Sequence, residues 1–528
     1  MWTGVPQGAP VLFSSPASLP VNSVASGFTL LDWAVLLLYL AGTTALGVWL
    51  GRGQKSARDY FVAGGTIPWW AVLFSIVATE TSALTFISIP GLAYLGDFTF
   101  LQIATGYLLG RIVVAYTLLP RYVEGELVTA YALLEQRFGR LTRRFASVTF
   151  MVTRAFGDSV RVFATAIPIA LILGPVVPSA YVMPTAILAL GATTLLYTYH
   201  GGMRAVVWTD VIQTFVYIGG GLGALYLIGS GVEGGWTSIL DRAGSAGKLR
   251  VFDAYTGLDR PHTILAGLLG GAFLSMASHG ADQIIVQRLL TSGSLRDARR
   301  ALIGSGFAVI LQFALFLLIG VGLWAFYEAR TFATPDQIFP TFIIQEMPPG
   351  MTGIVIAAIL AAAMSTVSGS LNSLAAATTH DLWVPFRGGM ADGPALLRAS
   401  KVFTLLWAVV LIGGALLYRE QGTPVVVIAL SIASFTYGGL LGGFFLAMLW
   451  RRAIQRDAIT GMAVGIAVMS VVVFAGRIAT AVPALAGPLG PVVGIAWPWF
   501  VLIGTTITMS VGILSSYTHA APGAARTA

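Results

Sequence analysis

The chain has 528 residues, of which 56% are hydrophobic and only 10% are charged, and its mean hydropathy is +0.82. Soluble globular proteins carry about 25% charged residues, so this composition excludes a soluble protein and indicates one embedded in a lipid bilayer. In a soluble chain the net charge of +8 would suggest a nucleic-acid partner. In a membrane protein it reflects basic loops on one side of the bilayer, and we expect no nucleic acid. Cysteine is absent, which excludes disulfides and thiolate metal sites.

Thirteen long apolar segments are candidates for membrane-spanning helices, because about 20 apolar residues are needed to cross a bilayer. They lie near residues 28–50, 68–95, 98–121, 145–174, 179–199, 205–230, 263–288, 299–328, 350–379, 400–418, 423–450, 457–477 and 494–517. The segments are continuous apolar runs, which favours helices over a β-barrel. The longest polar connection, 231–262, leaves no room for a separate soluble enzyme module. We therefore expect an all-α polytopic membrane protein.

The basic residues predict the orientation of the chain, because cytoplasmic loops are enriched in lysine and arginine. With the N-terminus outside, 20 of the 30 basic residues fall in inside loops, seven in outside loops and three at membrane depth. This distribution predicts an external N-terminal tail over residues 1–27, a membrane domain over 28–517 and a cytoplasmic C-terminal tail over 518–528. Residues 1–27 carry no charge and so lack the basic start of a signal peptide. We expect the plasma (inner) membrane as the location.

The second apolar segment contains "FSIVATETSALTFISIPG", residues 74–91, in which a carboxylate and six hydroxyls interrupt a hydrophobic run. The carboxylate is that of Glu80, and the hydroxyls are those of Ser75, Thr79, Thr81, Ser82, Thr85 and Ser88. A charge near the bilayer centre costs at least about 2.5–3.5 kcal/mol, so Glu80 is a candidate functional residue. Polar side chains at this depth are expected where a helix lines a water-filled cavity.

Other charges at membrane depth follow along the chain. They are Arg111, Arg154, Asp158, Arg161, Asp210 and Asp282. Arg111 fits a side chain that snorkels to the cytoplasmic surface. Arg154, Asp158 and Arg161 share one face of the fourth helix, where a salt bridge between helices and a substrate role fit the spacing equally well. Asp282 fits a helix cap or an ion pair with Arg288, whereas Asp210 has no such ready explanation.

A second hydroxyl cluster lies in the ninth segment, "ILAAAMSTVSGSLNSLAAATTHD". Its polar residues are Ser365, Thr366, Ser368, Ser370, Asn372 and Ser373. A single hydroxyl often bonds to its own helix or to a neighbouring one. Two clusters on interrupted helices instead supply the hard oxygen ligands of a small cation such as Na⁺. We expect the second and ninth segments to be interrupted and to share one alkali ion.

Four motifs resemble the sodium:solute symporter family, which includes sodium-coupled transporters of glucose, proline, monocarboxylates and sialic acid. They are "RDYFVAGGTIPWW" (58–70), "HGGMRAVVWTDVIQ" (200–213), "GADQIIVQRLL" (280–290) and "AAAMSTVSGSLNS" (361–373). These motifs occur in the family's order along most of the chain. The resemblance implies a leucine-transporter-type core of two inverted five-helix repeats, at about 68–230 and 263–450, within the thirteen-helix transporter domain.

The resemblance also implies a ligand set for the coupling ion, Na⁺. The family's main sodium ligands correspond to the carbonyls of Ala78, Thr81 and Ala362 and the hydroxyls of Ser365 and Thr366. A second ion in some members lies near the position of Asp210, with hydroxyl ligands at the positions of Ser368 and Gly369. Because glycine carries no hydroxyl, we expect a single Na⁺, with Asp210 and Ser368 at the second ion position or on the ion's exit path.

The resemblance narrows the solute class as well. Sugar transporters of the family carry an acid at the position of Leu84 and an aromatic pair at the positions of Ser278 and His279. This chain has neither, so we expect a monocarboxylate or an amino acid rather than a sugar, with Arg161 facing a carboxylate. The candidate substrate-binding residues are Thr79, Glu80, Ser82, Thr85, Arg161, Ser275, Ser278 and His279. Glu80 fits three roles equally: tuning sodium affinity, taking a proton, or facing a cationic amine.

We therefore expect a secondary active transporter that couples Na⁺ to a small organic solute by alternating access and acts as a monomer in the lipid bilayer. Two alternatives stay open. One is a proton-coupled transporter that uses Glu80 or Asp210. The other is a transporter-derived sensor or a channel-like protein. We do not expect an enzyme, because the sequence shows no nucleophile–base pair, phosphate loop or metal cluster.

Overall fold

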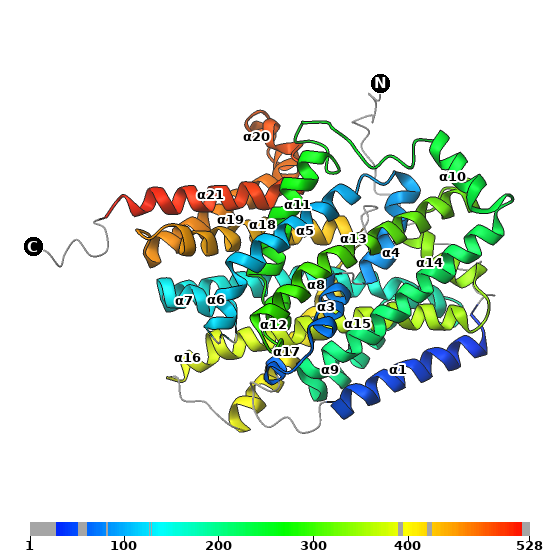
Figure 1. Ribbon diagram of the computed structural model, residues 1–528, viewed down its shortest axis with the longest axis horizontal. Helices are drawn as coiled ribbons and strands as arrows, with labels where there is room; N and C mark the ends of the chain where they lie inside the picture. The colour runs from blue at the N-terminus through cyan, green and yellow to red at the C-terminus, as the bar shows by residue number, and fades with distance from the viewer. Residues whose placement is uncertain are drawn as a thin grey trace, which may run out of the picture.

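The computed structural model describes residues 28–50, 61–80, 83–125, 127, 129–388, 394–419 and 425–519, and Figure 1 shows their arrangement. All regular elements in these residues are helices, apart from an isolated bridge between Ile67 and Ser292. The α-helices are α1 (Leu30–Leu50), α3 (Trp69–Glu80), α4 (Ala83–Leu95), α5 (Leu101–Thr117), α6 (Leu119–Glu124), α7 (Ala132–Phe138), α8 (Arg140–Leu173), α9 (Ser179–Gly231), α10 (Gly235–Ser245), α11 (Gly271–Met276), α12 (Gln283–Leu289), α13 (Leu295–Phe326), α14 (Ile338–Glu346), α15 (Met351–Ala377), α16 (Val384–Phe386), α17 (Pro394–Leu417), α18 (Val425–Leu449), α19 (Gln455–Ala481), α20 (Ala486–Val493) and α21 (Trp499–Ser516). Short 3₁₀ turns occur at Ala63–Gly65, Pro335–Gln337 and Pro483–Leu485, and π-helical turns occur at Ala266–Gly270 (η3), Ala277–Ala281 (η4) and Thr378–Trp383 (η6).

The all-helical membrane architecture predicted from composition is confirmed. Among the described residues, ten helices are long and apolar enough to cross a bilayer, and the bent pair α3 and α4 makes an eleventh if it counts as one span. The other two predicted segments, 98–121 and 263–288, are also helical, but α5 has 17 residues and the second segment is divided into short pieces. The count of thirteen spans therefore stays a prediction.

The long helix α9 contains two of the predicted segments, joined at a backbone kink. Gly202 lies at this kink with φ 59° and ψ −172°, a conformation that side-chain-bearing residues rarely adopt. The two halves, Ser179–Leu196 and Gly202–Gly231, each have the length and hydropathy of a span. The "HGG" sequence, residues 200–202, thus makes the turn between the two halves.

The second predicted segment is interrupted, as expected. Helix α3 ends at Glu80 and α4 begins at Ala83, and the two are inclined at 57°. The ninth segment is different: α15 runs without a break from Met351 to Ala377 and passes into a π-helical turn. The expectation that the ninth segment is interrupted was therefore wrong.

The second break lies in the seventh segment instead. Two π-helical turns flank the short helix α11, and the chain then becomes extended at Asp282, with φ −96° and ψ 126°. Helix α12 begins at the next residue, and the Asp282 carboxylate accepts a hydrogen bond from the amide of Ile284 at 2.9 Å. The predicted capping role of Asp282 is confirmed.

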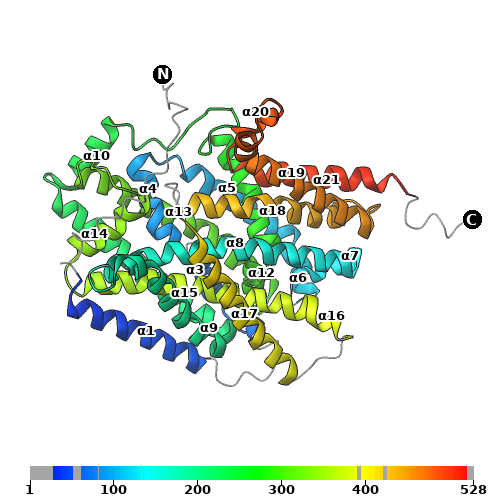
Figure 2. The same ribbon diagram turned by 180° about the vertical axis from the view of Figure 1, so that it is seen from behind.

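Helix α5 packs against the π-helical turn η3 and the adjoining helix α11, with backbone contacts that fix the position of the interrupted segment. A Cβ atom on Gly106 of α5 would lie 2.0 Å from the carbonyl oxygen of Gly267, and one on Gly267 would lie 2.6 Å from the backbone of Gln102. Small residues allow membrane helices to approach in this way. In Figures 1 and 2, α1 lies along one edge of the molecule and α19 and α21 along the opposite edge, with α3, α8, α13 and α15 between them.

Candidate solute and cation sites

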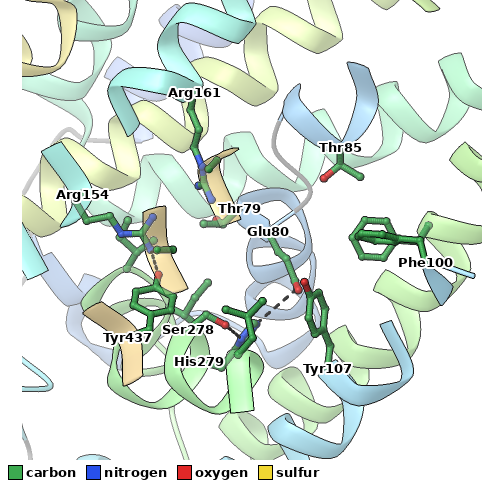
Figure 3. A pocket seen from close by; sticks show the side chains of 16 residues that line it. Thr79, Glu80, Thr85, Phe100, Tyr107, Arg154, Arg161, Ser278, His279 and Tyr437 are labelled. Carbon is green, nitrogen blue, oxygen red and sulfur yellow. Dashed lines mark hydrogen bonds and ion pairs between the residues drawn. The ribbon is translucent and has the colours of Figure 1, made fainter. Parts of the chain in front are cut away.

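A pocket in the middle of the helix assembly lies between the breaks of the second and seventh segments (Figure 3). Its walls come from α3, α4, α5, α8, α13, α18 and the interrupted seventh segment. The lining residues are Thr79, Glu80, Thr85, Phe100, Tyr107, Arg154, Arg161, Leu274, Ser278, His279, Ile284, Ile285, Phe313, Ala429, Ala433 and Tyr437. Besides Glu80 and Arg161, five of the predicted substrate residues lie in the part of the chain that the structure describes. Thr79, Thr85, Ser278 and His279 line the pocket, whereas Ser275 is not among the lining residues.

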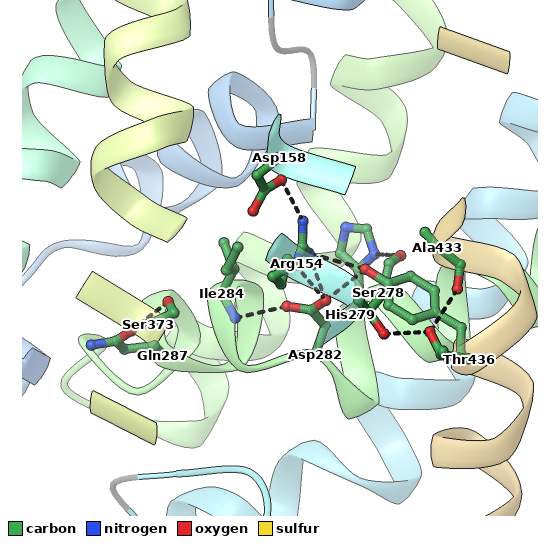
Figure 4. A network of polar contacts seen from close by, with 12 residues as sticks. Arg154, Asp158, Ser278, His279, Asp282, Ile284, Gln287, Ser373, Ala433 and Thr436 are labelled. Carbon is green, nitrogen blue, oxygen red and sulfur yellow. Dashed lines mark hydrogen bonds and ion pairs between the residues drawn. The ribbon is translucent and has the colours of Figure 1, made fainter. Parts of the chain in front are cut away.

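Two arginines reach this pocket from the same face of α8 (Figure 3), but their partners differ. Figure 4 shows the carboxylates around Arg154. Arg154 is held by the carboxylate of Asp282 at 2.5 Å, by Asp158 at 3.4 Å and by the hydroxyl of Tyr437 at 3.0 Å. Its charge is therefore matched within the protein.

Arg161 has weaker contacts with acidic groups of the protein than Arg154 has. Its nearest acidic partner among the described residues is Asp158, at 3.8 Å, and 20% of its side chain is exposed. The predicted shared face of α8 thus serves two purposes. Arg154 forms the bridge between helices, and Arg161 presents a guanidinium with free hydrogen-bonding capacity to the pocket.

Glu80, at the end of α3, forms an ion pair with Arg111 of α5. Arg111 is fully buried, and its second terminal nitrogen donates to the hydroxyl of Ser305 in α13 at 2.9 Å. The interpretation of Arg111 as a snorkelling surface side chain was therefore wrong, because a buried guanidinium needs a buried partner. A cationic amine on a solute would have to compete with Arg111 for Glu80.

His279 and Ser278 lie in the π-helical turn η4, opposite Glu80 (Figure 3). The imidazole Nε2 lies 3.6 Å from a Glu80 carboxylate oxygen, beyond hydrogen-bond distance, and Nδ1 lies 2.8 Å from the Ser278 hydroxyl. Nε2 is buried and has no hydrogen-bond partner. A buried polar atom without a partner beside a pocket is suited to contact a solute.

The remaining predicted substrate residues donate to backbone carbonyls or lie outside the described residues. Thr79 donates to the carbonyl of Ser75 at 2.7 Å, one turn earlier in α3. Ser275 donates to the carbonyl of Tyr107 at 2.9 Å and so joins α11 to α5. Ser82 lies outside the described residues, as does Thr81, which was predicted as a cation ligand.

Aromatic side chains form much of the wall, and sequence reasoning did not identify them. Phe100 and Phe313 pack edge to face with their ring centroids 5.1 Å apart, and Tyr107 lies 6.4 Å from Phe313. Tyr437 donates to Asp282 at 2.6 Å. Aromatic residues are common in apolar segments, so no local signal separates these from ordinary core residues.

The predicted cation ligands come from two helices that pack against each other, α3 and α15. Ala78 is buried in the last turn of α3, where carbonyl groups have no amide partner within the helix. Ala362, Ser365 and Thr366 are buried in α15, and the Thr366 hydroxyl donates to the Ala362 carbonyl at 3.1 Å. Neutral, buried oxygen atoms of this kind fit a Na⁺ ion.

Asp210 of α9 contacts three other helices beside these ligands. Its carboxylate accepts hydrogen bonds from Ser75 of α3 at 2.5 Å and from Ser365 of α15. It also forms an ion pair with Arg288 of α12 at 3.4 Å, and both of these side chains are fully buried. The carboxylate that sequence reasoning could not explain is therefore the meeting point of α3, α9, α12 and α15.

Arg288 occupies the space beside Gly369. A Cβ atom on Gly369 would lie 2.8 Å from a terminal nitrogen of the Arg288 guanidinium, so a larger residue would collide with it. Ser368 faces its own helix and donates to the carbonyl of Ser365 at 2.9 Å. A guanidinium thus lies close to where the second ion's missing hydroxyl ligand would be.

Known proteins are similar to this chain in sequence. Residues 60–465 match the family model described as the sodium:solute symporter family. The chain is 30% identical over 453 residues to the sodium/sialic acid symporter NanT of Aliivibrio fischeri, with 84% of this chain and 88% of that protein covered. It is also 30% identical over 449 residues to the sodium/sialic acid symporter SiaT of Proteus mirabilis, with 83% and 88% covered.

Solved structures show the same similarity. A Na⁺-coupled sialic acid symporter in a substrate-bound, outward-open state, with a novel Na⁺ site, superposes with a TM-score of 0.81 at 27% identity. The superposition covers 94% of this chain and 99% of that one. A nucleobase-cation-symport-1 family transporter in a closed conformation superposes with a TM-score of 0.53 at 13% identity, covering 87% of this chain and 94% of that one, which shows likeness of fold alone.

Proposed function

Because the chain belongs to the sodium:solute symporter family, we propose that it imports a small organic solute bearing a carboxylate, together with Na⁺, by alternating access. It is a transporter and not an enzyme. The observation that carries the solute class is the Arg161 guanidinium, which faces a pocket at membrane depth with only a distant acidic partner at 3.8 Å.

The proposed coupling acts through α3 and α15. Na⁺ would be held by the carbonyls of Ala78, Thr81 and Ala362 and by the hydroxyls of Ser365 and Thr366. An ion held this way connects the end of α3 to α15, and the end of α3 also carries Thr79 and Glu80 into the pocket. Coupling requires only that each ligand raises the other's affinity by the same factor. The movement of one Na⁺ down about 100 mV supplies about 2.3 kcal/mol.

We propose one Na⁺ per cycle, on the basis of the surroundings of Asp210. Arg288 already places a positive charge 3.4 Å from this carboxylate and fills the space beside Gly369. A second cation there would meet a buried guanidinium, which is unfavourable in a medium of low dielectric constant. Asp210 and Ser368 would then lie on the path by which the single ion leaves.

For the solute, we propose a carboxylate-bearing molecule and leave its size open. Sialic acid, a sugar with a carboxylate, and monocarboxylates both meet the requirement set by Arg161. Two similar proteins, NanT and SiaT, are named as sodium/sialic acid symporters. A preference for simple monocarboxylates or amino acids over a sugar acid has no support from these relatives, and a neutral sugar lacks the group that Arg161 would bind.

For the architecture, we propose thirteen spans with two inverted five-helix repeats at about 68–230 and 263–450. The bent pair α3 and α4 opens the first repeat, and the interrupted seventh segment opens the second. Breaks at corresponding positions are what inverted repeats produce. We further propose an inner-membrane monomer with its N-terminus outside and its C-terminus in the cytoplasm.

The proton-coupled alternative has less support. Glu80 is paired with Arg111, and Asp210 is paired with Arg288. Neither carboxylate is left without a cation, as a simple proton-binding site would require. Coupling to Na⁺ is the reading that the family and the cation ligands favour.

The experiment that tests the function is uptake into proteoliposomes. Radiolabelled sialic acid, a short monocarboxylate, an amino acid and glucose would be compared, each with an inward Na⁺ gradient, a K⁺ gradient or an acid-outside pH gradient. We expect Na⁺-dependent accumulation of one of the carboxylate-bearing solutes. Accumulation of glucose alone, or uptake driven by the pH gradient without Na⁺, would contradict the proposal.

A further inference from the structure

A groove separate from the transport pocket lies where α3 begins, α5 ends and α13 begins. It is lined by Trp69, Tyr116, Arg296, Arg299, Arg300, Ile303, Gly304 and Phe307. Its volume is about 540 Å³, against about 90 Å³ for the central pocket. None of these residues takes part in the proposed transport path, so the groove needs its own explanation.

The charge of the groove is concentrated in the first two turns of α13. Arg296, Arg299 and Arg300 lie at the N-terminal end of this helix, where the helix dipole disfavours positive side chains. The only acidic residue in these turns is Asp297, which caps the helix with Ser294 and lies 4.0 Å from Arg300. Three guanidinium groups and one carboxylate leave a local excess of positive charge that an anionic ligand would neutralise.

Arg299 is held in place before any ligand binds. Its Nε donates to the carbonyl of Ala115 in α5 at 3.0 Å, and its guanidinium lies 5.0 Å from the centre of the Tyr116 ring. No other hydrogen bond of this side chain occurs within the described ranges, so its two terminal nitrogens can donate to a ligand. A fixed guanidinium fork matches the oxygens of a phosphate group.

An apolar stripe continues directly from these arginines. Residues 296, 300, 303, 307 and 311 recur every three or four positions and therefore share one face of α13. Phe307 and Leu311, at the far end of the stripe, are 57% and 73% exposed. Trp69, 38% exposed on the opposite wall, has the amphipathic ring that marks the membrane–water boundary. Charge followed by apolar surface is the order of groups in a phospholipid.

We propose that this groove binds an anionic phospholipid. The phosphate contacts Arg296, Arg299 and Arg300, and an acyl chain lies along Phe307 and Leu311. Basic pockets between membrane helices at the cytoplasmic side recognise such headgroups, and the topology proposed above assigns this end of the molecule to the inner leaflet. The bound lipid connects the start of α3, half of the interrupted second segment, to α13.

The test is native mass spectrometry of the purified, delipidated full-length protein in detergent. Phosphatidylglycerol is titrated against phosphatidylcholine with the same acyl chains, and glycerol 3-phosphate serves as a soluble phosphate. The triple variant R296Q/R299Q/R300Q is compared with R144Q/R451Q/R456Q, which removes the same charge elsewhere. A third variant, F307A/L311A, shortens the apolar stripe and keeps the arginines.

We expect wild-type protein to bind phosphatidylglycerol in preference to phosphatidylcholine. The groove triple variant should weaken that binding on the order of a hundredfold, because each arginine near an anionic surface strengthens binding roughly fivefold. The control triple should not weaken it. F307A/L311A should weaken the binding of phosphatidylglycerol but not that of glycerol 3-phosphate. If the triple variant fails to fold, the single variants R296Q, R299Q and R300Q, each weakening binding in part, give the same comparison.

Three results would overturn the proposal. If the groove triple and the control triple bind phosphatidylglycerol alike, the three arginines have no role in binding. Equal binding of phosphatidylcholine would remove the charge requirement. Glycerol 3-phosphate that displaces phosphatidylglycerol at equal concentration would show a site for free phosphate instead of a lipid site.

Discussion

Arg154 and Arg161 have the same chemistry and lie on the same face of α8, yet their surroundings differ. Arg154 contacts two carboxylates and a tyrosine hydroxyl, whereas the acidic neighbour of Arg161 lies 3.8 Å away. A salt bridge at 2.5 Å fixes one guanidinium within the fold, and the other keeps its hydrogen-bonding groups for the pocket. Sequence spacing alone could not divide these roles, because Asp282 is 128 residues from Arg154.

The first prediction concerns Arg161 and the solute. Changing Arg161 to Gln should raise the KM for the carboxylate-bearing solute roughly 10- to 100-fold, because hydrogen bonds to charged groups contribute about 1.5–3 kcal/mol. Changing Arg161 to Lys should restore part of the affinity, since the charge is kept but the fork is lost. The measurement is initial uptake rate against solute concentration in proteoliposomes. R144Q serves as the control, and an unchanged KM in R161Q would remove Arg161 from the solute site.

The second prediction concerns the cation ligands of α15. Changing Ser365 or Thr366 to Ala should raise the Na⁺ concentration for half-maximal uptake about tenfold, equivalent to about 1.4 kcal/mol. Ser370 offers a matched control, because it is buried in the same helix and its hydroxyl has no hydrogen-bond partner. S370A should leave the sodium dependence unchanged. If S365A and T366A show the same sodium dependence as S370A, the proposed ligand set is wrong.

Sequence reasoning at the residue scale was limited by partners that are distant in the chain. Glu80 and Arg161 were found because a charge within an apolar run is visible directly. Arg111 was misread because its partner, Glu80, is 31 residues away on another helix. Tyr107 and Tyr437 were missed because their contribution depends on the wall to which they belong, which only the packed helices define.

At the scale of helices, the two interruptions differ in how far the sequence indicates them. The first falls between Glu80 and Ala83, within the hydroxyl-rich stretch that drew attention to this segment, while Pro90 lies inside α4. The second falls at Asp282, after two π-helical turns. A π-helical turn inserts one residue into a helix and so shifts the faces of the residues that follow. In a segment that is apolar or small on most sides this shift leaves little trace in the hydrophobic pattern, and the local sign of the break was the helix cap predicted at Asp282.

The Glu80–Arg111 pair connects the end of α3 to α5 and, through Ser305, to α13. Changing Glu80 to Gln should destabilise the protein by about 3–5 kcal/mol, because it leaves a buried guanidinium without its partner. The variant R111M should have a similar effect, and the double variant E80Q/R111M should recover most of the loss. Thermal unfolding monitored by fluorescence provides the measurement, and uptake by each variant shows whether transport follows stability.

The double variant also separates structure from transport. If E80Q/R111M regains stability and transports normally, the pair positions the end of α3 and does nothing more. If stability returns but Na⁺ affinity or solute affinity does not, Glu80 also contributes to one of the two sites. A loss of stability in the double variant equal to the sum of the losses in the two single variants would contradict a direct interaction.

At the scale of the whole molecule, the basic residues support one orientation, although the structure reassigns some of them. Arg288 was counted with an inside loop, but it is fully buried and contacts Asp210 and Ser75. Lys248, counted outside, donates to the carbonyls of Tyr94 and Gly96, and burial lowers its pKa. The loops still carry most of their arginines on one side, so the prediction of an external N-terminus does not depend on these two residues.

The absence of cysteine makes this orientation directly testable, because any thiol introduced is the only one in the chain. Ser245, at the exposed end of α10, lies in the connection predicted to be outside, and Thr518, exposed beyond α21, lies in the tail predicted to be cytoplasmic. In intact cells, a membrane-impermeant maleimide should label S245C, whereas T518C should react only after permeabilisation. The cysteine-free parent gives the background, and permeabilised cells show that both thiols are reactive. Labelling of T518C in intact cells, with S245C protected, would reverse the proposed topology and with it the assignment of the arginine-lined groove to the inner leaflet.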